Sequence, residues 1–179
     1  THRGGIAADG KTGDGCGLLI QKPDSFLRSE AMALFNHTFS DLYGVGMVFF
    51  DQDETLAKQQ RETLTAKLLE QEVKVVGWRE VPVDPACLGR IAEDCLPRIE
   101  QVFIDSNRMD ARTFSTRLFV ARRKAEIALS HFENFYVCSL SDKVLSYKGL
   151  MMPVDLPSFY KDLGNEALKT AICVFHQRF

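Results

Sequence analysis

The chain has 179 residues, of which 45% are hydrophobic and 26% charged, a composition typical of one ordinary soluble globular domain. Its 22 basic and 24 acidic residues give a net charge of −2, which favours neither a nucleic-acid surface nor an anionic-membrane surface. No apolar run approaches the roughly 20 residues that span a bilayer, and no signal segment opens the chain. We therefore expect neither a nucleic acid nor a membrane as a partner.

Five cysteines are scattered through the sequence, and their spacing matches no common metal site. No CxxC pair occurs, and an odd number of thiols without a secretion signal indicates a reducing compartment such as the cytoplasm. We expect five free thiols and no metal-binding residues. The cysteines are Cys16, Cys87, Cys95, Cys138 and Cys173.

A glycine-rich loop opens the chain, because residues 1–17 contain six of its twelve glycines. Glycine permits positive φ and close approach of the backbone to a ligand or another segment. A short strand is predicted over residues 17–21. Pro23 fits the first turn of a helix that runs to about Phe35.

The middle of the chain alternates strands and helices. Residues 45–50 form an apolar run of strand length, and Asp53 is a plausible cap for a helix through about Glu72. We expect that helix to bury Leu56, Leu64, Leu68 and Leu69 along one stripe. A strand over 73–81 and a short helix over 85–95 follow.

The second half begins with a strand over 98–105 and the longest helix, from Asp110 to about His131. Strands over 135–140 and 144–148 are separated by a short turn, which predicts a hairpin. The remaining expected elements are a short helix over 156–163 and a strand over 170–179. Strands and helices mix without a regular βαβ alternation, so the sequence predicts an α+β fold. The opening loop and the closing strand look interrupted, so we expect an interior fragment truncated at both ends.

The glycines at positions 13, 15 and 17 do not form a phosphate-binding loop. The GxGxxG pattern is absent, and a strand follows the glycines where a helix N-terminus would be needed. On the residues alone, a tight structural loop and a loop that approaches a ligand both remain open.

Three segments together resemble one family. HRGG followed by ADGKTGDGCGLLIQKPDSF (residues 8–26), the segment SYKGLMMPVDLPSFYKDL (residues 146–163) and the closing HQRF (residues 176–179) are similar to the glutaminase domain of glutamate synthases. That domain is a class II glutamine amidotransferase of the N-terminal-nucleophile hydrolase superfamily. The resemblance implies that residues 1–179 are a fragment of a single such domain, with a partial N-terminal-nucleophile fold, an αββα four-layer sandwich.

The resemblance also implies residue roles. Arg178 would bind the α-carboxylate of glutamine, for which a planar guanidinium is suited, and Arg3 would support the nucleophile end of the pocket. A structural arginine remains the alternative at each position. The nucleophilic cysteine of the family would lie upstream, so this fragment would contain no catalytic residue and would be inactive alone. Thr1 precedes HRG and is not expected to replace the missing nucleophile.

The implied function is release of ammonia from glutamine, for reductive amination of 2-oxoglutarate to L-glutamate elsewhere in the same enzyme. FMN and an iron–sulfur cluster would serve the full-length family, with none bound by this fragment. Glutamine, the remaining domains of the polypeptide and a small reductase subunit would be the partners, in the cytoplasm or in a plastid of a plant. The alternative function is a non-catalytic α+β interaction module that kept the fold and lost the nucleophile.

Overall fold

The computed structural model describes residues 5–177, which contain two antiparallel β-sheets. The smaller sheet has the order β6-β1-β7 and the larger has the order β3-β4-β2-β5. Every ladder that joins these strands is antiparallel, which confirms the α+β prediction. The strands are β1 (Cys16–Gln21), β2 (Tyr43–Phe50), β3 (Lys74–Glu80), β4 (Arg98–Asp105), β5 (Tyr136–Ser141), β6 (Val144–Gly149) and β7 (Cys173–Gln177).

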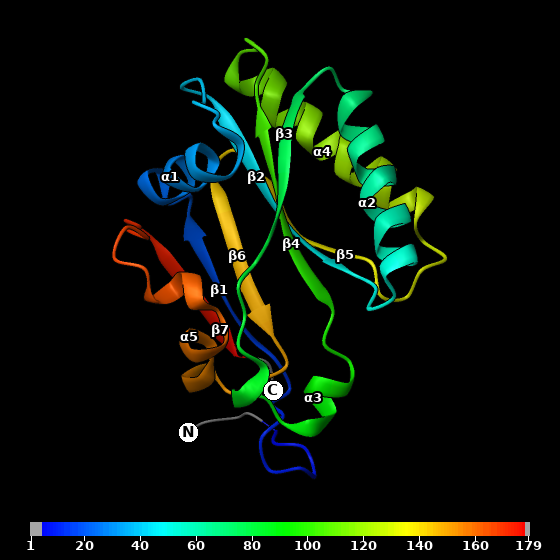
Figure 1. The fold of residues 1–179 in the computed structure, drawn as a ribbon, viewed down its shortest axis with the longest axis vertical. Helices are drawn as coiled ribbons and strands as arrows, with labels where there is room; N and C mark the ends of the chain where they lie inside the picture. The colour runs from blue at the N-terminus through cyan, green and yellow to red at the C-terminus, as the bar shows by residue number, and fades with distance from the viewer. Residues whose placement is uncertain (1–4, 178–179) are drawn as a thin grey trace.

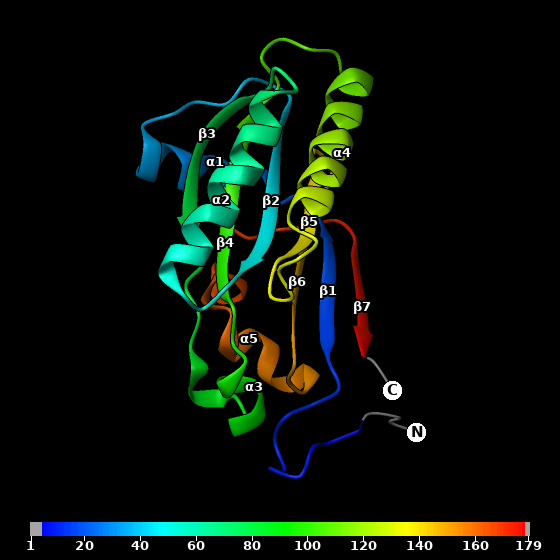
Figure 2. The same cartoon turned by 90° about the vertical axis from the view of Figure 1, so that its right-hand side faces the viewer.

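Helices lie on both sides of the sheets. Figure 1 shows α2 (Glu54–Leu69) and α4 (Ala111–Ala128) on one side of the larger sheet, with the smaller sheet, α1 (Asp24–Phe35) and α5 (Leu156–Phe159) on its other side. Turned by 90°, the same two long helices stand in front of the larger sheet (Figure 2). The short elements are η1 (Pro85–Cys87), α3 (Arg90–Asp94), η2 (Pro153–Asp155) and η3 (Lys161–Gly164).

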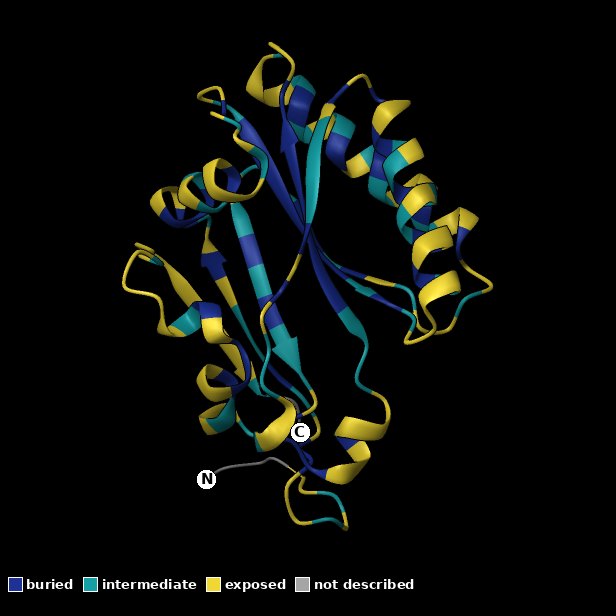
Figure 3. Ribbon diagram, viewed as in Figure 1, coloured by how far each residue is buried: buried dark blue, intermediate teal, exposed yellow. Residues whose placement is uncertain are grey.

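Two hydrophobic cores fill the spaces between these layers. One core lies between the larger sheet and the pair α2 and α4, where Phe114, Leu118 and Leu64 are buried. The other joins the opposite face of the larger sheet to β1, β6, α1 and α5 through residues such as Met47 and Tyr147. Strands β2 and β4 are buried on both faces, as their dark blue ribbons in Figure 3 show.

Local sequence signals explain why the two long helices begin where they do. Asp53 accepts hydrogen bonds from the backbone N–H groups of Thr55 and Leu56, and Asp110 caps α4 in the same way. Strand β2 approaches α4 closely because Gly44 has no side chain: a Cβ there would lie 2.9 Å from a methyl carbon of Leu118.

The predicted hairpin over 135–148 is wrong. Although a short turn connects β5 and β6, β5 pairs with β2 and β6 pairs with β1 in the other sheet. The hydroxyl oxygen of Ser141 accepts hydrogen bonds from the N–H groups of Lys143 and Val144, and this turn carries the chain from one sheet to the other.

Three helix predictions also need correction. The helix predicted over 156–163 is divided into α5 and η3, because Tyr160 between them is extended. The helix predicted over 85–95 is divided into η1 and α3, because Leu88 and Gly89 between them are extended. Helix α2 ends at Leu69, which is 55% exposed, so Leu69 does not belong to the buried stripe. Gln60 takes a place in that stripe, where its side-chain carbonyl accepts the N–H of Asp51 at 2.9 Å.

Candidate active site

The opening glycine-rich segment folds into a narrow loop that leads into β1. The N–H of Ala7 donates to the carbonyl of Thr12 at 2.8 Å, and Ile6 forms a bridge with Gly13. Gly10 and Gly15 have φ values of 72° and 118°, which only glycine adopts readily. The glycines therefore serve the turn of this loop.

The two arginines that the resemblance places at the site, Arg3 and Arg178, lie outside the described residues. Their nearest described neighbours are Gly5 and Gln177. The N–H of Gly5 donates to a carboxylate oxygen of Asp14 at 2.9 Å, and Gln177 is paired with Cys16 across the β1–β7 ladder. Segments that are about 170 residues apart in the sequence thus meet at the same end of β1.

A cavity of about 430 Å³ opens at this end of the smaller sheet. Gly17 lines this cavity and is paired with Lys148 of β6 on one side and with His176 of β7 on the other. A Cβ at Gly17 would lie 2.8 Å from the Cβ of Lys148, so glycine is required for this close approach. The lining residues are Asp14 to Leu19, Phe49, Ser146 to Leu150, Val174 and His176.

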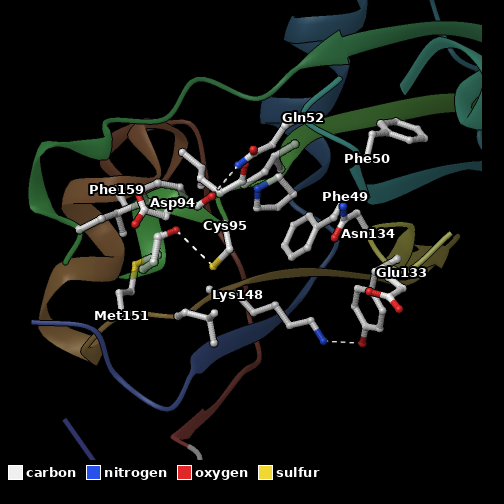
Figure 4. Close-up of a pocket in the computed structure, with 18 residues that line it drawn as sticks. Phe49, Phe50, Gln52, Asp94, Cys95, Glu133, Asn134, Lys148, Met151 and Phe159 are labelled. Carbon is white, nitrogen blue, oxygen red and sulfur yellow. Dashed lines mark hydrogen bonds between the residues drawn. The ribbon is translucent and has the colours of Figure 1, made fainter. Parts of the chain in front are cut away.

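A second cavity of about 440 Å³ adjoins the first (Figure 4). The two share Phe49 and the segment from Lys148 to Leu150. Lys148 places its ammonium 4.1 Å from the ring centroid of Tyr136 and donates a hydrogen bond to the Tyr136 hydroxyl. Gln52 holds another wall of the second cavity in place, because its side-chain amide donates to the backbone carbonyls of Asp94 and Leu96 at 3.2 and 2.8 Å.

Sequence reasoning did not single out Lys148 or Phe49 as residues of a site. Lys148 falls in the SYKGL segment that carries the family resemblance, and this was the signal that could have found it. Phe49 had no signal, because it belongs to an apolar strand and stands next to Phe50, which is buried in a core.

The five cysteines of the chain differ in burial and in hydrogen bonding. All five are free thiols, as predicted. Burial raises the pKa of Cys16 to about 11 and that of Cys138 to about 12, so both thiols are protonated at neutral pH. Cys173 is exposed but pairs with Ile20, away from the end of β7 at the cavity, and the Cys95 thiol donates to the carbonyl of Ile91.

Two features that other functions would require are absent from the described residues. Within residues 5–177, no three His, Cys, Asp or Glu side chains gather where they could hold a metal ion. Across the same residues, no helix is both long and apolar enough to cross a membrane.

The chain belongs to the class-II glutamine amidotransferases, because the sequence model of the family "Glutamine amidotransferases class-II" matches residues 1–179. Within that class it is similar to glutamate synthases. It is 43% identical to the "Glutamate synthase [NADPH] large chain" of Bacillus subtilis strain 168, over 99% of this chain and 12% of that protein. The resemblance drawn from the motifs is thereby confirmed.

The names of two less similar relatives mention ferredoxin and NADH instead of NADPH. The chain is 34% identical to "Ferredoxin-dependent glutamate synthase 1, chloroplastic/mitochondrial" of Arabidopsis thaliana, over 99% of the chain and 11% of the relative. It is 33% identical to "Glutamate synthase [NADH]" of Saccharomyces cerevisiae, over 100% of the chain and 9% of the relative. The chain therefore spans about a tenth of the length of the curated relatives it matches.

Proposed function

We propose that this chain forms part of the glutamine-hydrolysing domain of a glutamate synthase, and that glutamine binds at the 430 Å³ cavity. One observation supports this most. Gly5 donates a hydrogen bond to Asp14 and Gln177 pairs with Cys16, and both Asp14 and Cys16 line that cavity. Gly5 follows the HRG segment and Gln177 belongs to the HQR segment of a chain in the class-II glutamine amidotransferase family. On this proposal, residues 1–179 belong to one domain with an αββα N-terminal-nucleophile fold.

Two arginines would bind and orient the substrate. Arg178, which follows Gln177 at the end of β7, would form a forked pair of hydrogen bonds with the α-carboxylate of glutamine. Arg3 would support the end of the pocket at which the nucleophile acts. The cavity is large enough for this substrate, since ligand pockets begin at about 300 Å³.

A cysteine outside these 179 residues would supply the nucleophile. Its thiolate would attack the side-chain carbonyl of glutamine, and its own α-amine would take the thiol proton. Collapse of the tetrahedral intermediate, with its oxyanion held by hydrogen-bond donors, releases ammonia and leaves a thioester. Water hydrolyses the thioester to glutamate. None of the chain's five cysteines has a free α-amine, so the 179-residue chain would be inactive alone.

Other parts of the polypeptide would use the ammonia to convert 2-oxoglutarate into L-glutamate. In such an enzyme FMN and an iron–sulfur cluster would carry the electrons. On this proposal both groups would be bound by other parts of that enzyme. The further partners on this proposal are the remaining domains and a small reductase subunit. The proposed location is the cytoplasm, or a plastid in a plant, since one relative is named as chloroplastic.

Ammonia release from glutamine tests the proposal directly. The complete gene product should release ammonia from L-glutamine, and serine substitutions of Cys16, Cys87, Cys95, Cys138 and Cys173 should each leave this activity within about threefold when the variant folds. A covalent glutamine analogue should label a cysteine other than these five. Labelling of one of the five, or glutamine turnover by the 179-residue chain, would place the nucleophile inside it and refute the assignment.

A further inference from the structure

The glycine-rich loop is fastened to α3 by the side chain of Asp9. One carboxylate oxygen of Asp9 accepts the backbone N–H groups of Lys11 at 3.1 Å and Thr12 at 2.8 Å. The other accepts the hydroxyl of Thr12 and the backbone N–H of Ile91 at 3.0 Å. An ionised carboxylate has about four lone-pair sites, so these four hydrogen bonds saturate it.

The side chain of Thr12 extends the same connection. Its hydroxyl donates to Asp9 and accepts the backbone N–H of Ala92 at 3.2 Å, and the residue is only 5% exposed. Gly89 makes the contact possible: a Cβ at that position would lie 2.4 Å from the Thr12 hydroxyl oxygen and 2.5 Å from a carboxylate oxygen of Asp9. We call Asp9, Thr12 and Gly89 the loop clamp.

The loop clamp connects a segment that lines one cavity to a segment that lines the other. On one side the loop continues through Gly13, where a Cβ would lie 2.7 Å from the carbonyl oxygen of Met151, to Asp14 at the edge of the proposed glutamine cavity. On the other side α3 contributes Ala92 and Asp94 to the wall of the second cavity. A shift of the loop against α3 would therefore change the shape of the glutamine cavity.

Hydrogen bonding keeps Asp9 in the form that the clamp requires. The hydroxyl and the N–H of Thr12 hold the pKa of the Asp9 carboxyl well below its usual range, so it is ionised at any working pH. An ionised carboxylate is an acceptor only, and each of its contacts here is with a donor.

We propose that Asp9 and Thr12 are positioning residues for glutamine hydrolysis, which hold the loop that carries Asp14 and Gly15 in register with α3. The inference rests on the proposed function. The shape of the glutamine cavity would then depend on a contact that does not touch the substrate. Misplacement of a site by about 1 Å can reduce a rate on the order of 100-fold.

Four variants of the complete gene product test the clamp. Asp9→Asn replaces one acceptor oxygen by a donor, and Thr12→Val removes the hydroxyl but keeps the shape. Thr12→Ser keeps the hydroxyl. Asp53→Asn is the matched control, because Asp53 accepts two backbone N–H groups at 2.9 and 3.0 Å at the start of α2, where the glutamine cavity is not involved.

We expect Asp9→Asn and Thr12→Val to lower kcat/KM for glutamine about 10- to 100-fold. Thr12→Ser and Asp53→Asn should stay within about threefold of the wild type. Glutamate synthesis from free ammonia should be nearly unchanged in all four, because ammonia bypasses the glutamine cavity. Hydrogen exchange should become faster at the amides of Thr12, Ile91 and Ala92 in the first two variants only.

Two results would overturn the inference. One is faster exchange in Thr12→Val with unchanged kcat/KM for glutamine, which would make the clamp irrelevant to the site. The other is an equal loss with glutamine and with ammonia, which would indicate general destabilisation. A wild-type enzyme that does not hydrolyse glutamine would instead refute the proposed function, and the clamp inference with it.

Discussion

At the scale of single residues, burial determines which thiols of this chain can react. Cys16 is 6% exposed, and burial, with the nearby negative charge of Asp155, raises its pKa from an ordinary value of 9.0 to about 11. Between pH 9 and 11 the unfolded chain has lost this proton and the folded chain has kept it. The contribution of Cys16 to stability is therefore complete below pH 9 and is lost as pH rises through about 11.

This linkage predicts a difference between the wild type and Cys16→Ala. The free energy of unfolding, measured by denaturant titration from pH 7 to 11, should fall more steeply above pH 9 in the wild type than in the variant. Cys138 has a raised pKa in both proteins and cancels from the comparison. Parallel curves for the two proteins would show that Cys16 is not shielded from water in the way we describe.

At the scale of secondary-structure elements, the sequence was sufficient to predict features that depend on residues close together in the chain. The strand predicted over 98–105 is β4 with the same bounds, and the predicted helix start at Asp110 is the cap of α4. The buried residues Phe114, Leu118, Ala121 and Ala125 of α4 lie three or four positions apart, so they share one helix face. Asp53 was predicted as a cap for the same kind of reason.

Elements whose arrangement depends on distant partners could not be predicted in this way. The turn before β6 looked like a hairpin, but pairing with β1, more than 120 residues earlier, determines where β6 lies. For the same reason, only part of the candidate site could be predicted from the sequence. Arg3 and Arg178 were proposed from motifs, whereas the Asp9 contact with Ile91 joins two segments that have no pattern in common. Such contacts become visible only in three dimensions.

At the scale of the whole molecule, a buried ion pair joins several layers. The guanidinium of Arg79 in β3 forms two hydrogen bonds with the carboxylate of Asp162 in η3, at 2.8 and 2.6 Å. It also donates to Gln101 of β4 at 2.9 Å and contacts Glu30 of α1 at 2.8 Å. The hydroxyl of Tyr147 in β6 donates to Asp162 at 3.2 Å. The contacts of Arg79 and Asp162 therefore join five elements.

Removal of one partner should destabilise the fold strongly. Asp162→Asn removes the buried carboxylate that binds the Arg79 guanidinium through two hydrogen bonds and leaves the more exposed Glu30 as its acidic contact, and loss of one side of a buried pair costs about 3–5 kcal/mol. The double variant Arg79→Met with Asp162→Leu should recover part of this loss, because neither charge is then buried. Urea denaturation of the wild type and the two variants measures the effect. A single variant within about 0.5 kcal/mol of the wild type would mean that the pair does not hold the layers together.

The central claim, that glutamine is bound beside the end of β7, is tested most directly at Arg178 in the complete gene product. Arg178→Lys keeps the charge but removes the forked pair of hydrogen bonds, and Arg112→Lys on the exposed side of α4 is the matched control. Breaking a desolvated charge pair costs about 2–5 kcal/mol, so kcat/KM for glutamine should fall by a factor of roughly 30 or more. Activity with free ammonia should be nearly unchanged. Equal losses with glutamine and ammonia, or an unchanged kcat/KM for glutamine, would contradict the account.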